Sequence, residues 1–231
     1  MNRLLLGLLA AVLPLTAAAQ TPETTKIRLR AVLHDPMKPF AELYFQGAGG
    51  GMERLNLAME GLTVAQNASV QKGTLRLFTS ATIDPAKPLA NLAGAVTVPA
   101  DIRRAIVFIL PAGDKAKTPY QLMVLNDSFA AFPKGESRVI NMTALPLAVQ
   151  GGEHKMEVPA GKIVHLPSVA KVNDLNQAQT LFYRKAETGW VLLSERPMQY
   201  TPEIRNIFLM FLMPNVAEPQ IRTLVDTSTT S

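Results

Sequence analysis

Residues 26–33 read KIRLRAVL, and up to Ala31 basic and apolar side chains alternate along them. One side of the extended chain carries Ile27, Leu29, Ala31 and Leu33, and the other carries Lys26, Arg28 and Arg30. A period of two is typical of a β-strand with one buried face. The stretch therefore predicts a strand that packs its aliphatic side on a core, and residues 74–80 repeat the pattern.

Two apolar runs without alternation predict strands that are buried on both faces. Residues 103–110 contain six consecutive apolar side chains, and residues 207–213 form a second such run. Both are too short for a membrane-spanning helix, which needs about 20 residues. Further strands are expected at residues 39–46, 120–125, 138–142, 156–158, 163–166, 180–184 and 190–194. Helical periodicity is scarce, so the chain is predicted to be all-β.

The spacing of strands and turns predicts β-sandwiches. A glycine-rich hairpin tip is expected at residues 47–51, and about fourteen strands in all would fit two sandwiches of about seven. We expect two consecutive immunoglobulin-like domains, residues 20–115 and 116–225, followed by a flexible tail, residues 226–231. One larger sandwich is the alternative.

The first nineteen residues predict a signal peptide. Arg3 supplies a positive start, residues 4–15 form an apolar segment, and Ala17 and Ala19 match the small residues that signal peptidase recognises. Cleavage would leave Gln20 as the first residue. The protein is therefore expected to be exported to the periplasm or beyond the cell, without a transmembrane segment.

Composition excludes several classes of protein. The chain is 48% hydrophobic and 18% charged, which argues against disorder, and it has no cysteine for a disulfide or a thiolate site. The formal net charge is +5, but the basic residues are scattered and do not form a patch. A nucleic-acid partner is therefore not expected.

A resemblance concerns the turn Phe132-Pro133-Lys134-Gly135, the segment Arg138-Val139-Ile140-Asn141-Met142-Thr143 and the turn Pro159-Ala160-Gly161. These segments resemble exported all-β proteins of unknown function with an immunoglobulin-like sandwich. The resemblance implies a fold and a compartment, and no activity.

No catalytic set is recognisable in the sequence. The chain lacks Gly-x-Ser-x-Gly, and its histidines have no catalytic motif around them. Asp35 and the pair Asp127-Ser128 are explained by surface turns. We therefore expect a protein that is not an enzyme and has no cofactor.

One cluster suggests a metal site as an alternative. His154, Met156 and His165 flank a predicted tight turn at residues 160–161. A two-residue loop would place Met156 opposite His165, with His154 in diagonal reach. Imidazole and thioether groups suit copper, so a periplasmic copper carrier is one alternative function. In the other interpretation Met156 and Val158 belong to the core and the backbone satisfies both histidines.

The aromatic residues suggest a second alternative. Trp190 is the single tryptophan, at the start of a predicted strand. It is either a core residue or, in a glycan-binding module, an exposed ring that stacks on a sugar. Our main expectation is a non-catalytic binding or scaffold module that has a protein partner in the cell envelope.

Overall fold

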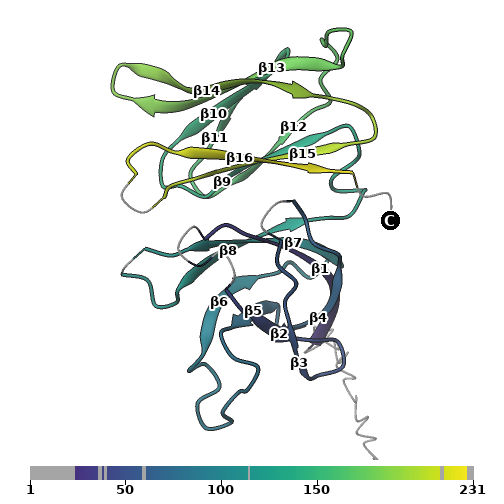
Figure 1. Ribbon diagram of the computed structural model, residues 1–231, viewed down its shortest axis with the longest axis vertical. Coiled ribbons are helices and arrows are strands. Elements are labelled where there is room, and N and C mark those ends of the chain that lie inside the picture. Colours follow the sequence, from purple (N-terminus) through teal and green to yellow (C-terminus); the bar gives the residue numbers. More distant parts are fainter. Residues whose placement is uncertain are drawn as a thin grey trace, which may run out of the picture.

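The computed structural model describes residues 24–35, 38, 41–58, 61–113, 115–213 and 216–227, and in these it is all-β (Figure 1). Its strands are β1 (Thr24–Leu33), β2 (Tyr44–Gln46), β3 (Met52–Arg54), β4 (Gln66–Gln71), β5 (Thr74–Phe78), β6 (Leu92–Thr97), β7 (Arg104–Pro111), β8 (Tyr120–Asn126), β9 (Ser137–Asn141), β10 (Leu147–Gly151), β11 (His154–Val158), β12 (Ile163–Leu166), β13 (Gln177–Ala186), β14 (Gly189–Gln199), β15 (Arg205–Phe211) and β16 (Gln220–Asp226). The predicted fold class is confirmed. Within the described residues, no helix has the length and apolar character needed to cross a membrane.

The first half of the chain forms one eight-stranded sheet. Its order is β3-β2-β5-β4-β1-β7-β8, and β6 pairs with β5. The sheet curls around a core to which the aliphatic side of β1 contributes Ile27, Leu29, Ala31 and Leu33, as the alternation predicts. β6 comes so close to β8 that a Cβ on Gly94 would lie 2.9 Å from the carbonyl oxygen of Tyr120. Only glycine fits at that position without a shift of the backbone.

The second half forms two four-stranded sheets packed face to face. Their orders are β11-β10-β13-β14 and β12-β9-β15-β16. The core between them contains the edge-to-face pair Phe182 and Phe208, with ring centroids 5.3 Å apart. This half is a β-sandwich.

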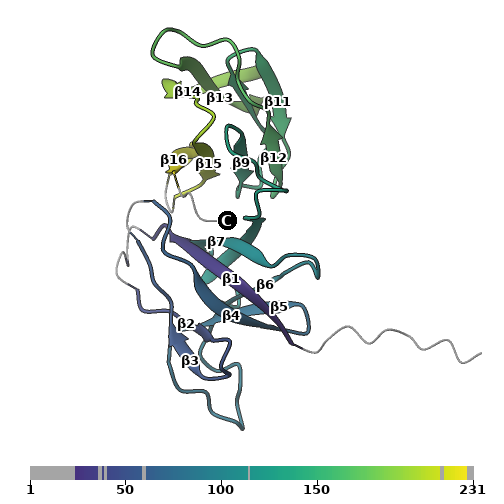
Figure 2. The same cartoon turned by 90° about the vertical axis from the view of Figure 1, so that its right-hand side faces the viewer.

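A third core joins the two halves. One face of β7 supplies Ile106, Phe108 and Leu110 to it, and β15 supplies Ile207, Leu209 and Phe211 from the opposite side. The apolar residues between these point into the core of their own half, Ala105, Val107 and Ile109 from β7 and Phe208 and Met210 from β15, so β7 and β15 are buried on both faces, as their apolar runs predict. Figure 2 shows the resulting stack, with β1 and β7 below, β9, β15 and β16 in the middle, and β13 and β14 above.

The chain changes from one half to the other later than the sequence predicts. The expected boundary between residues 115 and 116 falls inside the connection of β7 to β8, which pair along their length. The crossing lies instead at residues 127–136, between β8 and β9. The hairpin tip at residues 47–51 is confirmed, since Gln46 pairs with Met52. The predicted signal peptide, with Ala17 and Ala19, lies outside the described residues.

Candidate functional site

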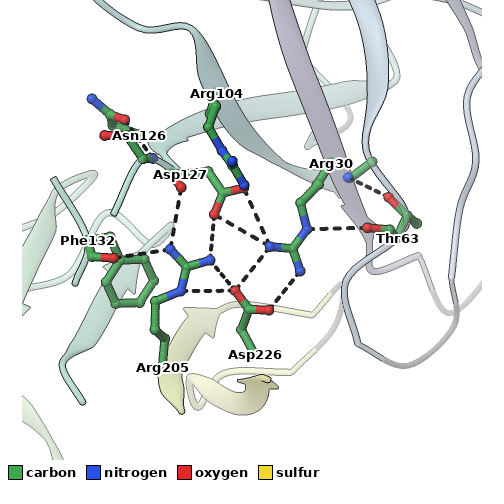
Figure 3. Close-up of polar contacts among 10 residues, drawn as sticks. Arg30, Thr63, Arg104, Asn126, Asp127, Phe132, Arg205 and Asp226 are labelled. Carbon is green, nitrogen blue, oxygen red and sulfur yellow. Dashed lines mark hydrogen bonds and ion pairs between the residues drawn. The ribbon is translucent and has the colours of Figure 1, made fainter. Parts of the chain in front are cut away.

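The junction between the halves contains a buried network of charged side chains (Figure 3). Its members are Arg30 on β1, Arg104 on β7, Asp127 just after β8, Arg205 at the start of β15 and Asp226 at the end of β16. Four of the five are buried, with exposed fractions of 7% for Arg30, 2% for Asp127, 1% for Arg205 and 4% for Asp226. The network therefore links elements that are far apart in the sequence.

Asp226 is held by two arginines. Arg30 donates to both of its oxygens, from Nη1 at 3.0 Å and from Nη2 at 2.9 Å. Arg205, its partner in the β15–β16 register, donates to Oδ2 from Nε at 3.0 Å and also from Nη2. Such a forked pairing is the strongest arrangement that a carboxylate makes with guanidinium groups.

Asp127 accepts hydrogen bonds from the same two arginines. Nη2 of Arg205 lies 2.7 Å from its Oδ1, and Nη1 of Arg30 lies 3.4 Å from its Oδ2. Arg205 also donates to the carbonyl oxygen of Phe132 at 3.1 Å and stacks over that ring, 4.5 Å from its centroid. Nη2 of Arg104 is 4.0 Å from Oδ2 of Asp127.

This arrangement keeps Arg30 charged although it is buried. Desolvation by itself would lower the pKa of Arg30, but the hydrogen bonds and charges of Asp226 and Asp127 raise it above its ordinary value. Breaking a buried ion pair by removing one partner costs about 3–5 kcal/mol, because the other charge is left uncompensated. The network is therefore a clamp between the two halves.

Sequence reasoning missed this clamp. Residue 226 was expected in a flexible tail and Asp127 in a surface turn, but both carboxylates are buried. Asp35 is also buried, and its Oδ2 accepts a hydrogen bond from the hydroxyl of Tyr120 at 2.9 Å. One feature of the sequence could have indicated that the basic side of β1 is partly buried. Val32 is an apolar residue on the same side of β1 as Arg28 and Arg30, and it packs in the third core.

The register predicted for the copper site is wrong. The turn itself exists, with a hydrogen bond from the Lys162 amide to the Pro159 carbonyl at 3.2 Å. However, β11 pairs with β10 and β12 pairs with β9, so the turn leads from one sheet of the sandwich to the other. Met156 therefore lies opposite Val149, and His165 lies opposite Arg138.

Each histidine of the proposed copper set has a different partner. Nε2 of His154 lies 3.0 Å from the carbonyl oxygen of Ser168, and Nε2 of His165 lies 2.8 Å from a carboxylate oxygen of Glu136. Met156 packs against the core of the sandwich. Among the described residues no three or more histidine, aspartate or glutamate side chains are grouped as metal ligands would be. The arrangement on which the copper interpretation depended is therefore not formed.

Trp190 lies near the start of β14 and is half-buried. It pairs across the strands with Lys185, whose Nζ lies 4.9 Å from the ring centroid. The contact covers one part of the ring with a lysine. Trp190 is thus neither a core residue nor an open stacking platform.

A groove lies on the outer side of the eight-stranded sheet. It has a volume of about 860 Å³, and its lining includes Gln46, Gln71, Arg76, Phe78 and Leu89. The amide of Gln71 donates to that of Gln46 across the groove. Its lining residues come from several strands of the sheet and from the loop after β5.

A smaller groove lies along one side of the sandwich, between β14 and the start of β16. It has a volume of about 310 Å³ and is lined by residues 191–194, Arg196 and residues 218–221. Beside it, Nε of Arg184 lies 2.7 Å from a carboxylate oxygen of Glu218. No protein-family model and no curated protein sequence matches this chain.

Proposed function

We propose that this protein is an exported, non-catalytic binding and scaffold module that holds an extended polypeptide along β14. The observation that carries the proposal is the edge position of this strand. β14 has eleven residues, is the last strand in its sheet and pairs only with β13 among the described residues. An edge strand offers unpaired backbone N–H and C=O groups to an additional strand.

The side chains of β14 favour an apolar partner segment at one end. Val191 is 37% exposed and Leu192 is 48% exposed, and Leu193 lines the adjacent groove. An added strand with apolar side chains at alternate positions would cover these groups. The gain is about 25 cal/mol for each Å² of apolar surface removed from water.

The other end of β14 has features that limit pairing. Glu195 and Arg196 place charges on the edge, and Pro197 lacks a backbone N–H. The sequence of the strand therefore restricts addition to residues 189–194. Such a restriction favours one partner segment over open-ended aggregation.

The stacked architecture supports a scaffold role. The third core and the arginine clamp join the two halves, so a partner bound at β14 would be held by a rigid body. Export follows from the predicted signal peptide, and mass spectrometry of the purified protein should find Gln20 as its first residue.

Photo-crosslinking in cells tests the proposal. A crosslinking amino acid at Leu192 should give a discrete protein adduct, whereas the same amino acid at Leu175 should not. Leu175 is a matched control because it is 67% exposed but lies in a loop. The adduct at position 192 should disappear in the Val191→Lys variant, since a charge on the edge opposes strand addition. Equal adducts at both positions, or an adduct unchanged by Val191→Lys, would contradict the proposal.

A further inference from the structure

The groove on the outer side of the eight-stranded sheet plays no part in the proposed function. Its volume of about 860 Å³ lies within the range of sites that hold small organic ligands, about 300–1,000 Å³. The groove crosses five strands, which pair in the order β3-β2-β5-β4-β1, and the loop between β5 and β6 forms a further wall. A ligand in it would therefore meet side chains from neighbouring strands instead of the backbone of a single edge.

Alternation along β4 and β5 supplies the polar part of the groove. Leu75 and Leu77 of β5 point into the first core, so the residues on either side of them point outward. The polar residues of the two strands that line the groove are Ser69, Gln71, Thr74 and Arg76.

Two glutamine side chains in the groove are held in place by hydrogen bonds. The amide nitrogen of Gln71 donates to Oε1 of Gln46, and Nε2 of Gln46 donates to the carbonyl oxygen of Gly50 at 3.3 Å. Oε1 of Gln71 has no hydrogen-bond partner among the described residues. An amide offers donors and an acceptor side by side, and a sugar hydroxyl both donates and accepts. The two amides are therefore positioned to bind hydroxyl groups.

Arg76 makes the groove suitable for a negatively charged ligand. The charged residues of the lining are Lys72 and Arg76, and both are positive. Arg76 is half-buried, and its guanidinium group makes no hydrogen bond or ion pair with any described residue. Its cross-strand neighbour on β6 is Ala95, whose side chain has no polar group. Since a guanidinium group presents its donors in a planar fork that fits a carboxylate, a carboxylate is the group that Arg76 would bind best.

An apolar patch adjoins Arg76. Phe78 is the next outward residue of β5, and Leu89, which is 55% exposed, lies in the loop that forms the further wall. The other apolar side chains of the lining are Met52, Ile83 and Pro88. A sugar ring has C–H groups on its faces and hydroxyls at its edge, so it matches a groove that is polar on one part and apolar on another.

We infer that this groove binds a saccharide chain with carboxylate groups. One carboxylate contacts Arg76, hydroxyls contact Gln71 and Gln46, and the faces of the sugar rings lie against Phe78 and Leu89. An acidic peptide would satisfy the arginine but not the two amides in this way. The site lies in the first half of the chain, away from β14, so the inference goes beyond the proposed function.

Calorimetric titration of the full chain with acidic tetrasaccharides tests the site, at constant ionic strength. The probes are the linear tetramers of galacturonate and of mannuronate, which carry a carboxylate on each sugar. We expect saturable binding of at least one tetramer and a loss of affinity of about tenfold or more in Arg76→Gln, the effect of a lost charge-assisted hydrogen bond. Arg103→Gln is the matched control. It removes the same charge from an exposed arginine in the same half, outside the groove, and should change the affinity less than about twofold.

Two further ligands separate the contribution of charge from that of the saccharide. The methyl ester of the tetramer keeps every hydroxyl but has no carboxylate charge. It should bind the unchanged protein about tenfold more weakly, and Arg76→Gln should cause little further loss, because both changes remove the same interaction. A peptide of four glutamates carries the charges without the sugar and should show no saturable binding.

Thermal unfolding in the absence of ligand checks that the variant is folded. Arg76→Gln should melt at the same temperature as the unchanged protein, because Arg76 has no partner among the described residues. Four results would each overturn the inference: no saturable binding of either tetramer, equal losses in Arg76→Gln and Arg103→Gln, equal affinity for the glutamate peptide, or a lower melting temperature of Arg76→Gln.

Discussion

Replacing Asp226 by asparagine should destabilise the protein strongly, although the change is nearly isosteric. The carboxylate accepts two hydrogen bonds from Arg30, at 3.0 and 2.9 Å, and a further one from Nε of Arg205 at 3.0 Å. Asp226 is 4% exposed, so little of its surface is in contact with water. In Asp226→Asn, three buried or half-buried arginines share the single carboxylate of Asp127. Loss of one partner from a buried ion pair costs about 3–5 kcal/mol, and we expect a decrease of this size in the free energy of unfolding.

Equilibrium unfolding in urea measures the effect. The midpoint should fall while the slope of the transition stays the same, which identifies a change in stability rather than in compactness. Asp174→Asn provides the control, because Asp174 is an exposed loop residue, and it should change the free energy by less than about 0.5 kcal/mol. A loss below about 1 kcal/mol in Asp226→Asn would refute the reasoning. It would mean that residue 226 behaves as part of a flexible tail.

Three other changes test the structure at separate places. Gly94→Val should lower the free energy of unfolding by about 1–3 kcal/mol, since its Cβ would lie 2.9 Å from a backbone oxygen, while Gly49→Ala has open space and should have little effect on the urea midpoint. Phe208→Ala should lose about 3–5 kcal/mol in the same assay, because the ring is fully buried against Phe182. The backbone hydrogen bond from Ala170, with those from Glu153 itself and Lys171, lowers the pKa of Glu153 to about 2. The contribution of Glu153 to stability should therefore be present above a pH of about 4.3 and be lost as the pH falls toward 2. A protection factor of the Ala170 amide, its exchange rate relative to the intrinsic rate at each pH, that stays constant over this range would contradict this.

Local patterns were sufficient to predict the strands because side-chain periodicity is a local property. The alternation at residues 26–33 predicts which side of β1 faces the first core, and that side is fully buried. The unbroken apolar runs of β7 and β15 predict burial on both faces, which the stack confirms. Each of these conclusions needs only the residues of one strand.

Strand partners could not be predicted in the same way. The turn at residues 159–162 is a local structure and is present, but its flanking strands pair with β10 and β9 in different sheets. The sequence cannot distinguish a hairpin from a connection between sheets when the turn is compatible with both. The assumed hairpin register therefore brought His154, Met156 and His165 together in the prediction but not in the structure.

The sequence by itself determined that this chain is all-β, where most strands lie, and which two strands are buried on both sides. Only the tertiary structure decided that the basic side of β1 is covered by a second layer at Arg30 and remains open at Arg28. The same packing turned Asp127 and Asp226 from apparent surface residues into the buried partners of Arg30 and Arg205. The physical reason is that the cost of burying a charge depends on its partners in space. Here those partners are up to 196 positions apart in the chain.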